Sequence, residues 1–435
     1  MAATVLLRVV EQGAYAMQAL DSEIQRARLS ERDAALATEI VYGSLRVLPE
    51  LDAIVAPRLK RGLASTDGLT LAVLRASAYQ LAHLGRVPTH AIVDGAVGFI
   101  RRARGRPVAG FVNAVLRKLA VQRPEDPQPA TRTVVPEWLY ASLAEALGAA
   151  RTQALLELRS GTPPVCLCVP HGKRHQVVTT LTTAIPHAQI AAGDLSPDAV
   201  IVRRAGDPRR LPGFAQGGFW VQEEGAQLVG LAVGAAPGEQ VADLCAGHGG
   251  KTLFLANRMG GRGGLTSADV DEAKLALIPG ELSRLGLAGL AFSAHTVDLT
   301  VGLGGLSGGY DRVLVDAPCA GLGTLHRRPE LLLRLAPADL DRMASVQLEL
   351  LSRACQLVRP GGSLTYAVCS LSRAEGAGVA AALEGRFETL RRADAAAHLP
   401  DIASDSDGIL RIGPWLSRGA SAPDGYQVVS WDVTA

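Results

Sequence analysis

The chain has 435 residues, of which 48% are hydrophobic and 20% charged; this composition is typical of a globular protein and excludes an intrinsically disordered one. The length predicts about two or three domains. The formal net charge of +2 is nearly balanced, so overall charge argues neither for nor against a nucleic-acid partner, and any contact with a polyanion has to be local.

The cysteines and the start of the chain bear on the cellular compartment. Six cysteines without regular spacing exclude a disulfide framework and favour reduced, cytosolic thiols. Residues 1–15 include Arg8 and Glu11 and no long apolar run, so we expect no signal peptide. No stretch reaches the roughly 20 apolar residues of a membrane span, so we expect a cytoplasmic protein without a membrane contact.

Residues 1–125 predict an all-helical domain. Ser30 precedes Glu31 and Asp33, an N-cap followed by acidic residues in the first helical turn. Pro88 and the stretch 105–107 interrupt the series, and a proline-rich stretch at 123–129 predicts a linker. Apolar residues recur at helical spacing in 14–29, 31–48, 51–59, 69–84, 91–101 and 111–119.

The middle of the chain predicts two more helices and then a small α+β module. The region 126–160 contains the linker and the helices 137–147 and 151–159. The module, residues 161–215, is expected to contain strands at 165–169 and 199–202 and a helix at 176–184.

The region 216–435 alternates strand and helix patterns, which predicts an α/β domain with a doubly wound, mainly parallel sheet, Rossmann-like in class. Two late strands, 387–390 and 426–433, are expected to close one edge of this sheet. The other predicted strands are 240–245, 264–269, 291–297, 312–316 and 363–368.

A glycine loop follows the first of these strands and opens a helix at Thr252. Gly250-Lys251-Thr252 ends like a phosphate-binding P-loop, but that motif needs glycine at position 245, where this chain has Cys245. The dinucleotide pattern G-x-G-x-x-G also fails after Gly247-His248-Gly249. A P-loop-like NTPase therefore remains only as an alternative.

S-adenosylmethionine, which carries no phosphate, fits this loop better. Asp269 ends the second strand and can accept hydrogen bonds from both ribose hydroxyls. Asp298 follows the third strand and can accept the adenine amine, and Asp243 is expected near the cofactor ammonium. The sequence therefore predicts a methyltransferase site.

Two cysteines follow separate strands: Cys319 in Asp-Ala-Pro-Cys (316–319), and Cys369 in Tyr-Ala-Val-Cys-Ser-Leu (366–371). Ligands bind at the carboxyl ends of strands in an open α/β sheet, so two thiols delivered there can face one substrate atom. A thiolate that adds to C6 of a pyrimidine makes C5 nucleophilic enough to take a methyl group. Asp316 can hold the edge of the same base.

Three motifs resemble the RNA cytosine-C5 methyltransferases of the Sun/RsmB type: Asp-Leu-Cys-Ala-Gly-His-Gly-Gly-Lys-Thr (243–252), 316–330 and 366–371. The resemblance implies that Cys369 is the nucleophile, that Cys319 promotes product release and that Asp316 acts beside them. DNA C5 methyltransferases also carry Pro-Cys, but there that cysteine attacks. The residues expected to contact the cofactor or the base are Cys245, Ala246, Gly247, His248, Gly249, Gly250, Lys251, Asp269, Asp298 and Asp316.

The amino-terminal helices resemble NusB, an RNA-binding helical domain, in the segments 34–43, 74–79 and 111–117. The combination implies the bacterial small-subunit rRNA enzyme of the family. The chain departs from the family pattern at Gly247-His248, where Ala-Pro is usual, and at 372–376, where Pro-Glu-Glu-Asn is common. These departures leave a catalytically degenerate RNA-binding or ribosome assembly factor as a second alternative.

Basic clusters are the candidate RNA contacts, because phosphate binding is electrostatic. With 4% aromatic residues the chain offers few stacking platforms, so shape and phosphate contacts should dominate. We expect a monomeric enzyme without a metal that forms 5-methylcytosine in 16S rRNA or in a small-subunit assembly particle. The expected RNA-binding residues are Arg101, Arg102, Arg104, Arg106, Arg327 and Arg328.

Overall fold

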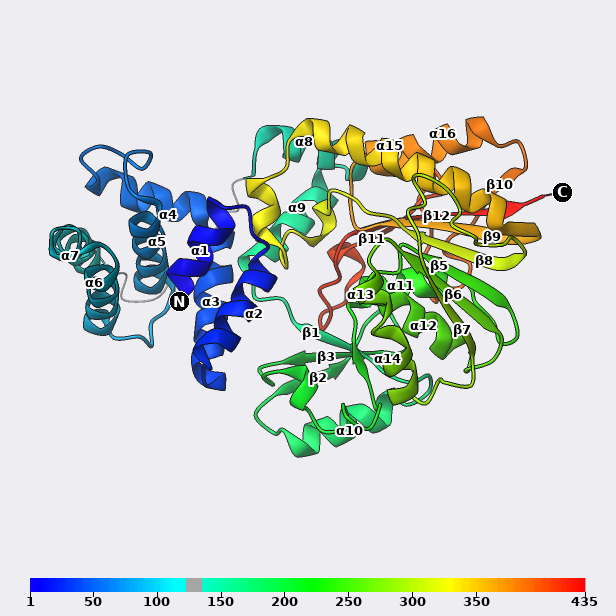
Figure 1. The fold of residues 1–435 in the computed structure, drawn as a ribbon, viewed down its shortest axis with the longest axis horizontal. Helices are drawn as coiled ribbons and strands as arrows, with labels where there is room; N and C mark the ends of the chain where they lie inside the picture. The colour runs from blue at the N-terminus through cyan, green and yellow to red at the C-terminus, as the bar shows by residue number, and fades with distance from the viewer. Residues whose placement is uncertain (123–134, 435) are drawn as a thin grey trace. The chain divides into compact units, whose positions relative to one another are not determined.

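The structure is a computed structural model and describes residues 1–122 and 135–434 (Figure 1). The predicted linker at 123–129 lies outside these described residues. The chain forms two compact units. The first comprises Met1–Pro136, Leu156–Thr162 and Leu325–Arg334, and the second comprises Glu137–Leu155, Pro163–Thr324 and Leu335–Ala435. The four predicted domain boundaries stay a prediction.

The first unit is helical, as predicted, and is built around α5, in which nearly every residue from Leu69 to Tyr79 is buried. Ser30 caps α3 by accepting a hydrogen bond from the Asp33 amide, 3.2 Å away. The helices are α1 (Ala2–Val10), α2 (Ala16–Ala27), α3 (Glu31–Arg46), α4 (Leu48–Val55), α5 (Gly68–His83), α6 (Thr89–Arg104) and α7 (Arg106–Val121).

One helix of this series was missed, and one predicted break is confirmed. The helix α1 was missed, because its buried apolar positions lie in a nine-residue segment that starts at the second residue. The predicted break at 105–107 is confirmed, because Gly105, which has a φ of +86°, separates α6 from α7. Pro107 lies in the first turn of α7, where a missing amide hydrogen costs nothing.

Two segments from later in the sequence also belong to the first unit. The Arg46 Nε donates to the carbonyl oxygen of His326 at 3.3 Å, and Arg159 Nη2 donates to the carbonyl oxygen of Arg46 at 3.3 Å. The guanidinium of Arg334 lies 4.5 Å from the centre of the Tyr15 ring. The stretch directly after the cysteine loop at 316–324 is therefore held by the helical unit.

The second unit contains the predicted doubly wound sheet, with strand order β10-β12-β9-β8-β5-β6-β7 and with β11 paired to β12. The pairs among β5 to β9 are parallel, and β12 is antiparallel to β9 and β10. The strands are β5 (Gln240–Leu244), β6 (Gly264–Asp269), β7 (Ala291–Thr296), β8 (Tyr310–Asp316), β9 (Val358–Val368), β10 (Leu390–Ala393), β11 (Leu410–Ile412) and β12 (Tyr426–Val433).

Helices cover both faces of this sheet, because successive strand residues point to opposite sides. Leu314 packs with α11 (Glu224–Ala232) and α12 (Gly250–Arg258) in one apolar layer. Its neighbours Val313 and Val315 pack with α15 (Pro337–Ala354) and α16 (Val379–Arg386) in the other, which Figure 1 shows in yellow and orange. The shorter helices α13 (Glu272–Leu275) and α14 (Ile278–Arg284) join the first layer.

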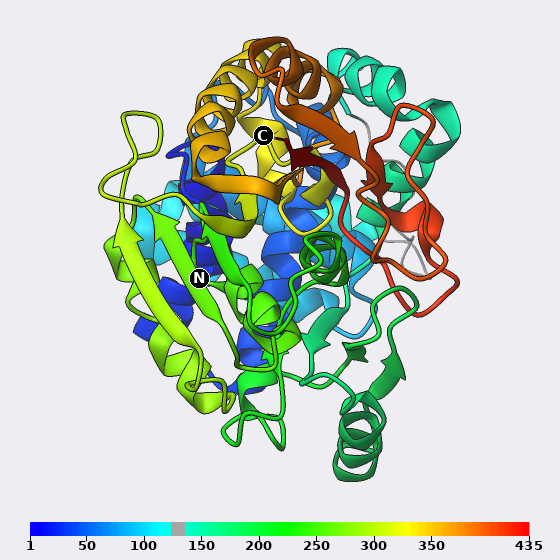
Figure 2. The ribbon, with the colours of Figure 1, turned by 90° about the vertical axis from the view of Figure 1, so that its right-hand side faces the viewer.

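A smaller antiparallel sheet, with order β2-β3-β1-β4, corresponds to the predicted α+β module and lies beside the larger sheet (Figure 2). Its edge strands β2 and β4 were missed, because β2 is largely exposed and β4 has only two residues. The elements are β1 (Val165–Cys168), α10 (Arg174–Ala184), β2 (Gln189–Ala192), β3 (Ala199–Arg203) and β4 (Trp220–Val221), preceded by α8 (Glu137–Leu147) and α9 (Ala149–Glu157). Among the described residues, no helix is long and apolar enough to cross a membrane.

Candidate active site

Two thiols meet at one edge of the larger sheet. β8 and β9 pair in parallel with Asp316 opposite Ala367, so the segments that follow them leave the sheet side by side. Cys319 lies in the first of these segments and Cys369 directly follows β9. Their Sγ atoms are 3.3 Å apart, and both residues are partly exposed. The structure thus brings both predicted reacting residues together, within reach of a ligand.

The buried carboxylate of Glu375 connects the two cysteine loops. Its Oε1 accepts a hydrogen bond from the amide of Ala320 at 2.7 Å, next to Cys319. Its Oε2 accepts from the hydroxyls of Ser370 and Ser372, which follow Cys369, the latter at 3.1 Å. Glu375 therefore binds the backbone that follows Cys319 and the serine side chains that follow Cys369.

Two buried glutamines complete this support. Gln347 of α15 donates from Nε2 to the Pro318 carbonyl oxygen at 2.9 Å, directly before Cys319. Gln427 of β12 donates from Nε2 to the carbonyl oxygens of Ser370 and Ser372, each at 2.9 Å. Sequence reasoning missed these residues and Glu375. Gln347 and Glu375 lie in stretches of mixed polar and apolar residues, 344–349 and 370–376, so no local pattern marked them.

Lys251 and Asp316 form an ion pair beside the thiols. Lys251 Nζ lies 2.5 Å from Asp316 Oδ2 and 5.5 Å from the centre of the Tyr426 ring. Burial alone lowers the pKa of the Lys251 ammonium, but the charges of Asp316 and Asp243 outweigh burial, and the net pKa lies above its usual value. The described residues give the other oxygen of Asp316 no hydrogen bond, so it can accept one from a ligand.

The thiol pair is electrostatically asymmetric. The hydrogen bond with Cys369, followed by burial, raises the pKa of Cys319 well above its usual value. Cys319 therefore keeps its proton near neutral pH, and either sulfur can be the donor in the contact between the two.

The glycine loop is open on the side where a cofactor is expected. Cys245, Gly247 and Gly249 all have positive φ, which turns the loop back over the end of β5. A Cβ atom added at Gly247 or Gly250 would meet nothing within 4 Å. At Gly249 it would lie 2.6 Å from Ile278 Cγ1, so that glycine is required by packing. The open space beside Gly247 and Gly250 suits the close approach of S-adenosylmethionine to the backbone.

The strand-end acids differ in their surroundings. Asp269 Oδ2 accepts from the Gly247 amide at 2.8 Å, which ties the second strand to the glycine loop. Asp243 is fully buried and accepts from the Thr252 hydroxyl at 2.6 Å, and burial raises its pKa to about 7. Its Oδ1 is buried and has no hydrogen-bond partner among the described residues, which fits an ammonium group of the cofactor.

Other predicted contacts lie on the surface. Asp298 is exposed and accepts from the amide and hydroxyl of Thr300 at 2.8 and 2.6 Å. His248 is exposed at the tip of the glycine loop. Their contacts with the cofactor stay predictions, as do those of the rest of the 245–251 loop.

The arginines expected to bind RNA lie in the first unit. Four of them, Arg101, Arg102, Arg104 and Arg106, are exposed near the junction of α6 and α7, and Arg104 pairs with Asp67 at 3.1 Å. The guanidinium of Arg328 lies 5.5 Å from the centre of the Tyr15 ring. The neighbouring Arg327 lies in the same segment, Leu325–Arg334. Whether these residues bind RNA stays a prediction.

The strand order, the antiparallel β12 and the glycine loop after β5 define the class of the protein. This is the fold of the S-adenosylmethionine-dependent methyltransferases, and the chain is one of them. S-adenosylmethionine is accordingly its methyl donor. The P-loop alternative finds no support in this fold.

Comparison with known proteins gives the family. The chain matches the model described as 16S rRNA methyltransferase RsmB/F over residues 231–412 and the NusB family model over residues 1–121. It belongs to the small-subunit ribosomal RNA methyltransferase B family, and is thus an rRNA methyltransferase that carries a NusB domain.

Individual similarities cover most of the chain. A probable ribosomal RNA small subunit methyltransferase B of Bacillus subtilis (strain 168) is 32% identical, over 85% of this chain and 84% of its own length. The ribosomal RNA small subunit methyltransferase B of Pseudomonas syringae pv. tomato is 31% identical, over 91% of this chain and 88% of its own length. The crystal structure of PH0851 is similar in fold, with a TM-score of 0.80 at 20% identity, and the match covers 99% of this chain and 98% of that one.

Proposed function

We propose that this enzyme methylates C5 of a cytosine in 16S rRNA through a covalent adduct between Cys369 and C6 of the base. The observation that carries the proposal is the 3.3 Å contact between the Cys319 and Cys369 sulfur atoms, beside the Lys251–Asp316 pair. Two thiols at one point suit a reaction in which a covalent bond to the enzyme forms and is then broken.

The proposed reaction begins when the Cys369 thiolate adds to C6. The electron pair of the C5–C6 double bond then moves toward C5, which becomes nucleophilic. Residues 245–251 and Asp269 would hold S-adenosylmethionine, which would supply the methyl group to C5 and leave as S-adenosylhomocysteine. Loss of the C5 proton to a base restores the double bond and expels Cys369 as a thiolate.

Two neighbouring groups support this sequence of steps. Asp316 has a free oxygen with which to accept a hydrogen bond from the base edge, while Lys251 compensates its charge. The protonated Cys319 donates toward the Cys369 sulfur and stabilises it when it leaves. A target base in a helix has to leave its stack to reach these groups.

Methyl transfer to an unmodified 16S rRNA transcript, and to small-subunit particles from a strain lacking the gene, tests the proposal. Bisulfite sequencing of both substrates should reveal one new 5-methylcytosine. Cys369→Ala should abolish its formation, and Cys319→Ala should accumulate an RNA–protein adduct that survives denaturing electrophoresis. Undiminished turnover of Cys369→Ala would reject the mechanism.

The alternative of a degenerate assembly factor rested on His248 and on the altered stretch 372–376. That stretch retains Glu375, whose carboxylate contacts both cysteine loops, so it keeps a group that can position the two thiols. Calorimetry that detects no S-adenosylmethionine binding would favour the alternative, whereas micromolar binding together with methyl transfer would exclude it.

A further inference from the structure

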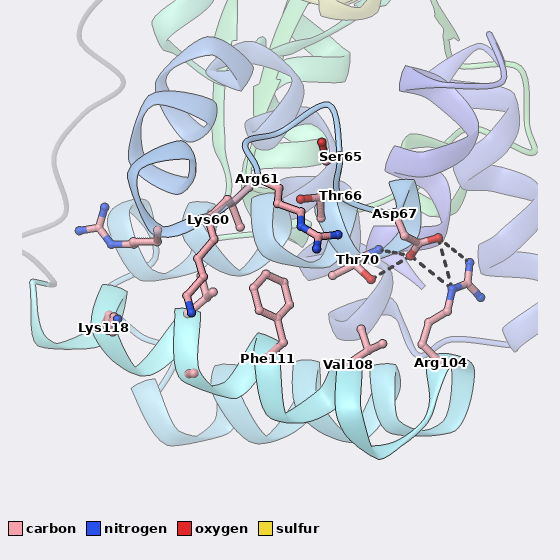
Figure 3. Close-up of a pocket in the computed structure, with 14 residues that line it drawn as sticks. Lys60, Arg61, Ser65, Thr66, Asp67, Thr70, Arg104, Val108, Phe111 and Lys118 are labelled. Carbon is pink, nitrogen blue, oxygen red and sulfur yellow. Dashed lines mark hydrogen bonds and ion pairs between the residues drawn. The ribbon is translucent and has the colours of Figure 1, made fainter.

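A cavity lies within the helical unit. It has a volume of about 660 Å³ and is bounded by the loop between α4 and α5 and by one face of α7 (Figure 3). Five cationic side chains and one carboxylate line it. They are Arg58, Lys60, Arg61, Arg104, Lys118 and Asp67. The cavity is of the size that holds a small ligand or a single nucleotide rather than a folded domain.

Part of this positive charge is already used by the protein. Asp67 accepts from Arg104 Nη2 at 3.1 Å and from the Thr70 amide at 3.0 Å. Arg58 donates to the Ile54 carbonyl oxygen at 2.6 Å and to Gln122.

The other three cations are available to a ligand. Lys60, Arg61 and Lys118 are exposed, and within the part of the chain that the structure describes they have no hydrogen bond or ion pair. Like charges placed this close repel one another, so an anionic ligand stabilises the arrangement.

The floor of the cavity is apolar and includes one aromatic ring. Phe111 keeps 38% of its surface exposed, although Val112 and Val115 next to it on α7 are buried in the core. Figure 3 shows the Phe111 ring rising from α7 toward the loop, with Lys60 and Arg61 reaching down beside it. An exposed ring surrounded by unpaired cations is the combination that binds single-stranded nucleic acid, since bases stack on the ring while phosphates meet the cations.

We propose that this cavity binds an unpaired nucleotide of the rRNA substrate, with its base stacked on Phe111 and its flanking phosphates held by Lys60, Arg61 and Lys118. The inference rests on the proposed function, because that function has rRNA, a polyanion, as its substrate. An acidic protein segment would also meet the cations, but its carboxylates would make no use of the exposed ring. The cavity is a contact for a part of the rRNA other than the target base.

The test uses the full-length protein and a fluorescein-labelled ten-residue polyuridine strand, with anisotropy measured at several salt concentrations. Lys60→Glu/Arg61→Glu should weaken binding at least tenfold and reduce the slope of log affinity against log salt by about one to two. The matched control is Arg32→Glu/Arg86→Glu, which makes the same charge change at exposed residues that do not line the cavity. It should change affinity less than threefold.

The aromatic ring is tested separately. Phe111→Ala should weaken binding by about fivefold to a hundredfold with an unchanged salt slope, and Phe111→Tyr should restore it. An RNA duplex of the same charge should lose no affinity in Phe111→Ala. Thermal unfolding verifies that each variant is folded, and Phe111→Leu replaces Phe111→Ala if the latter unfolds.

Three results would overturn the inference: equal weakening by the two double variants, no effect of Phe111→Ala, or displacement of polyuridine by polyglutamate at lower concentration than by unlabelled RNA. A methyl-transfer assay keeps the two proposals apart. If the cavity variants weaken polyuridine binding but the wild-type protein transfers no methyl group, the proposed function is rejected and the proposed role of the cavity remains. Methyl transfer with an unchanged KM for 16S rRNA in all cavity variants would reject the proposed role of the cavity and leave the proposed function intact.

Discussion

Glu375 Oε1 accepts a hydrogen bond from the backbone amide of Ala320, 2.7 Å away, across 55 positions of sequence. Ala320 directly follows Cys319, and the other oxygen of the same carboxylate accepts from the serines that follow Cys369. The distance between the two sulfurs is therefore set by a residue that touches neither. Glu375 is a positioning residue in this sense.

Substitution of Glu375 should separate stability from catalysis. Glu375→Ala leaves the Ala320 amide and two serine hydroxyls without their acceptor and should lower the free energy of unfolding by about 2–3 kcal/mol. Glu375→Gln keeps an acceptor for Ala320 and should lose less. Both should lower kcat at least tenfold with little change in the KM for S-adenosylmethionine.

The discriminating readout for Glu375 is the covalent adduct. In a Cys319→Ala background, Glu375→Gln should slow adduct formation, because Cys369 is no longer held in place. The control is Glu349→Gln, at an exposed acid on α15 that pairs with Arg386 at 2.9 Å. Normal adduct formation in Glu375→Gln would show that the residue serves stability alone.

Gly250→Ala tests the cofactor site without straining the fold. Gly250 has no positive φ, lies at the start of α12 and faces open space, so alanine there should leave stability unchanged or raise it by about 0.5–1 kcal/mol. If the open space belongs to S-adenosylmethionine, the added methyl group should weaken its binding several-fold by calorimetry. Unchanged affinity would place the cofactor elsewhere.

Gly249→Ala, in the same loop, should destabilise the fold, in contrast to Gly250→Ala. It combines a φ of +79° with a Cβ only 2.6 Å from Ile278 Cγ1, so it should lower the free energy of unfolding by about 1–3 kcal/mol. Chemical denaturation measures the loss. A stability equal to that of the wild type would show that the loop can rearrange freely.

Lys251→Met removes the cation that compensates Asp316. Only 11% of the Lys251 side chain and 29% of the Asp316 side chain are exposed, so the remaining charge is poorly solvated. We expect a loss of about 1–3 kcal/mol in unfolding free energy and at least a tenfold drop in kcat. Lys274→Met, which removes a lysine paired with Asp271 at 3.2 Å, serves as the control and should retain activity.

Asp243 should make stability depend on pH. Burial raises its folded-state pKa to about 7 from an ordinary 3.8, so folding favours the protonated carboxyl. This contribution is fully present below pH 3.8 and is lost as pH rises to 7, by at most about 4 kcal/mol. Asp243→Asn should lack this decline when unfolding is followed from pH 4 to pH 8. A wild-type curve parallel to that of Asp243→Asn would contradict the assignment.

Local patterns in the sequence were sufficient for most of the elements, although not for α1, β2 and β4, and for the two cysteines at the strand ends. The parallel strands followed from short apolar runs separated by helical patterns, and Cys319 and Cys369 were recognisable because each lies within three residues of the end of such a run. Strand ends are local features, and parallel pairing brings them to one edge whatever the details of packing. The family motifs could be read for the same reason.

The supporting residues depended on contacts between distant segments. Nothing near Glu375 in the chain shows that its carboxylate reaches Ala320, and nothing near Lys60 shows that Phe111 of α7 lies opposite it. Both relationships arise when helices pack, and packing depends on the combined shape of many side chains. Motif spacing therefore determined which thiols we propose to react, while the tertiary structure alone decided what holds them in place and where we propose that a second ligand binds.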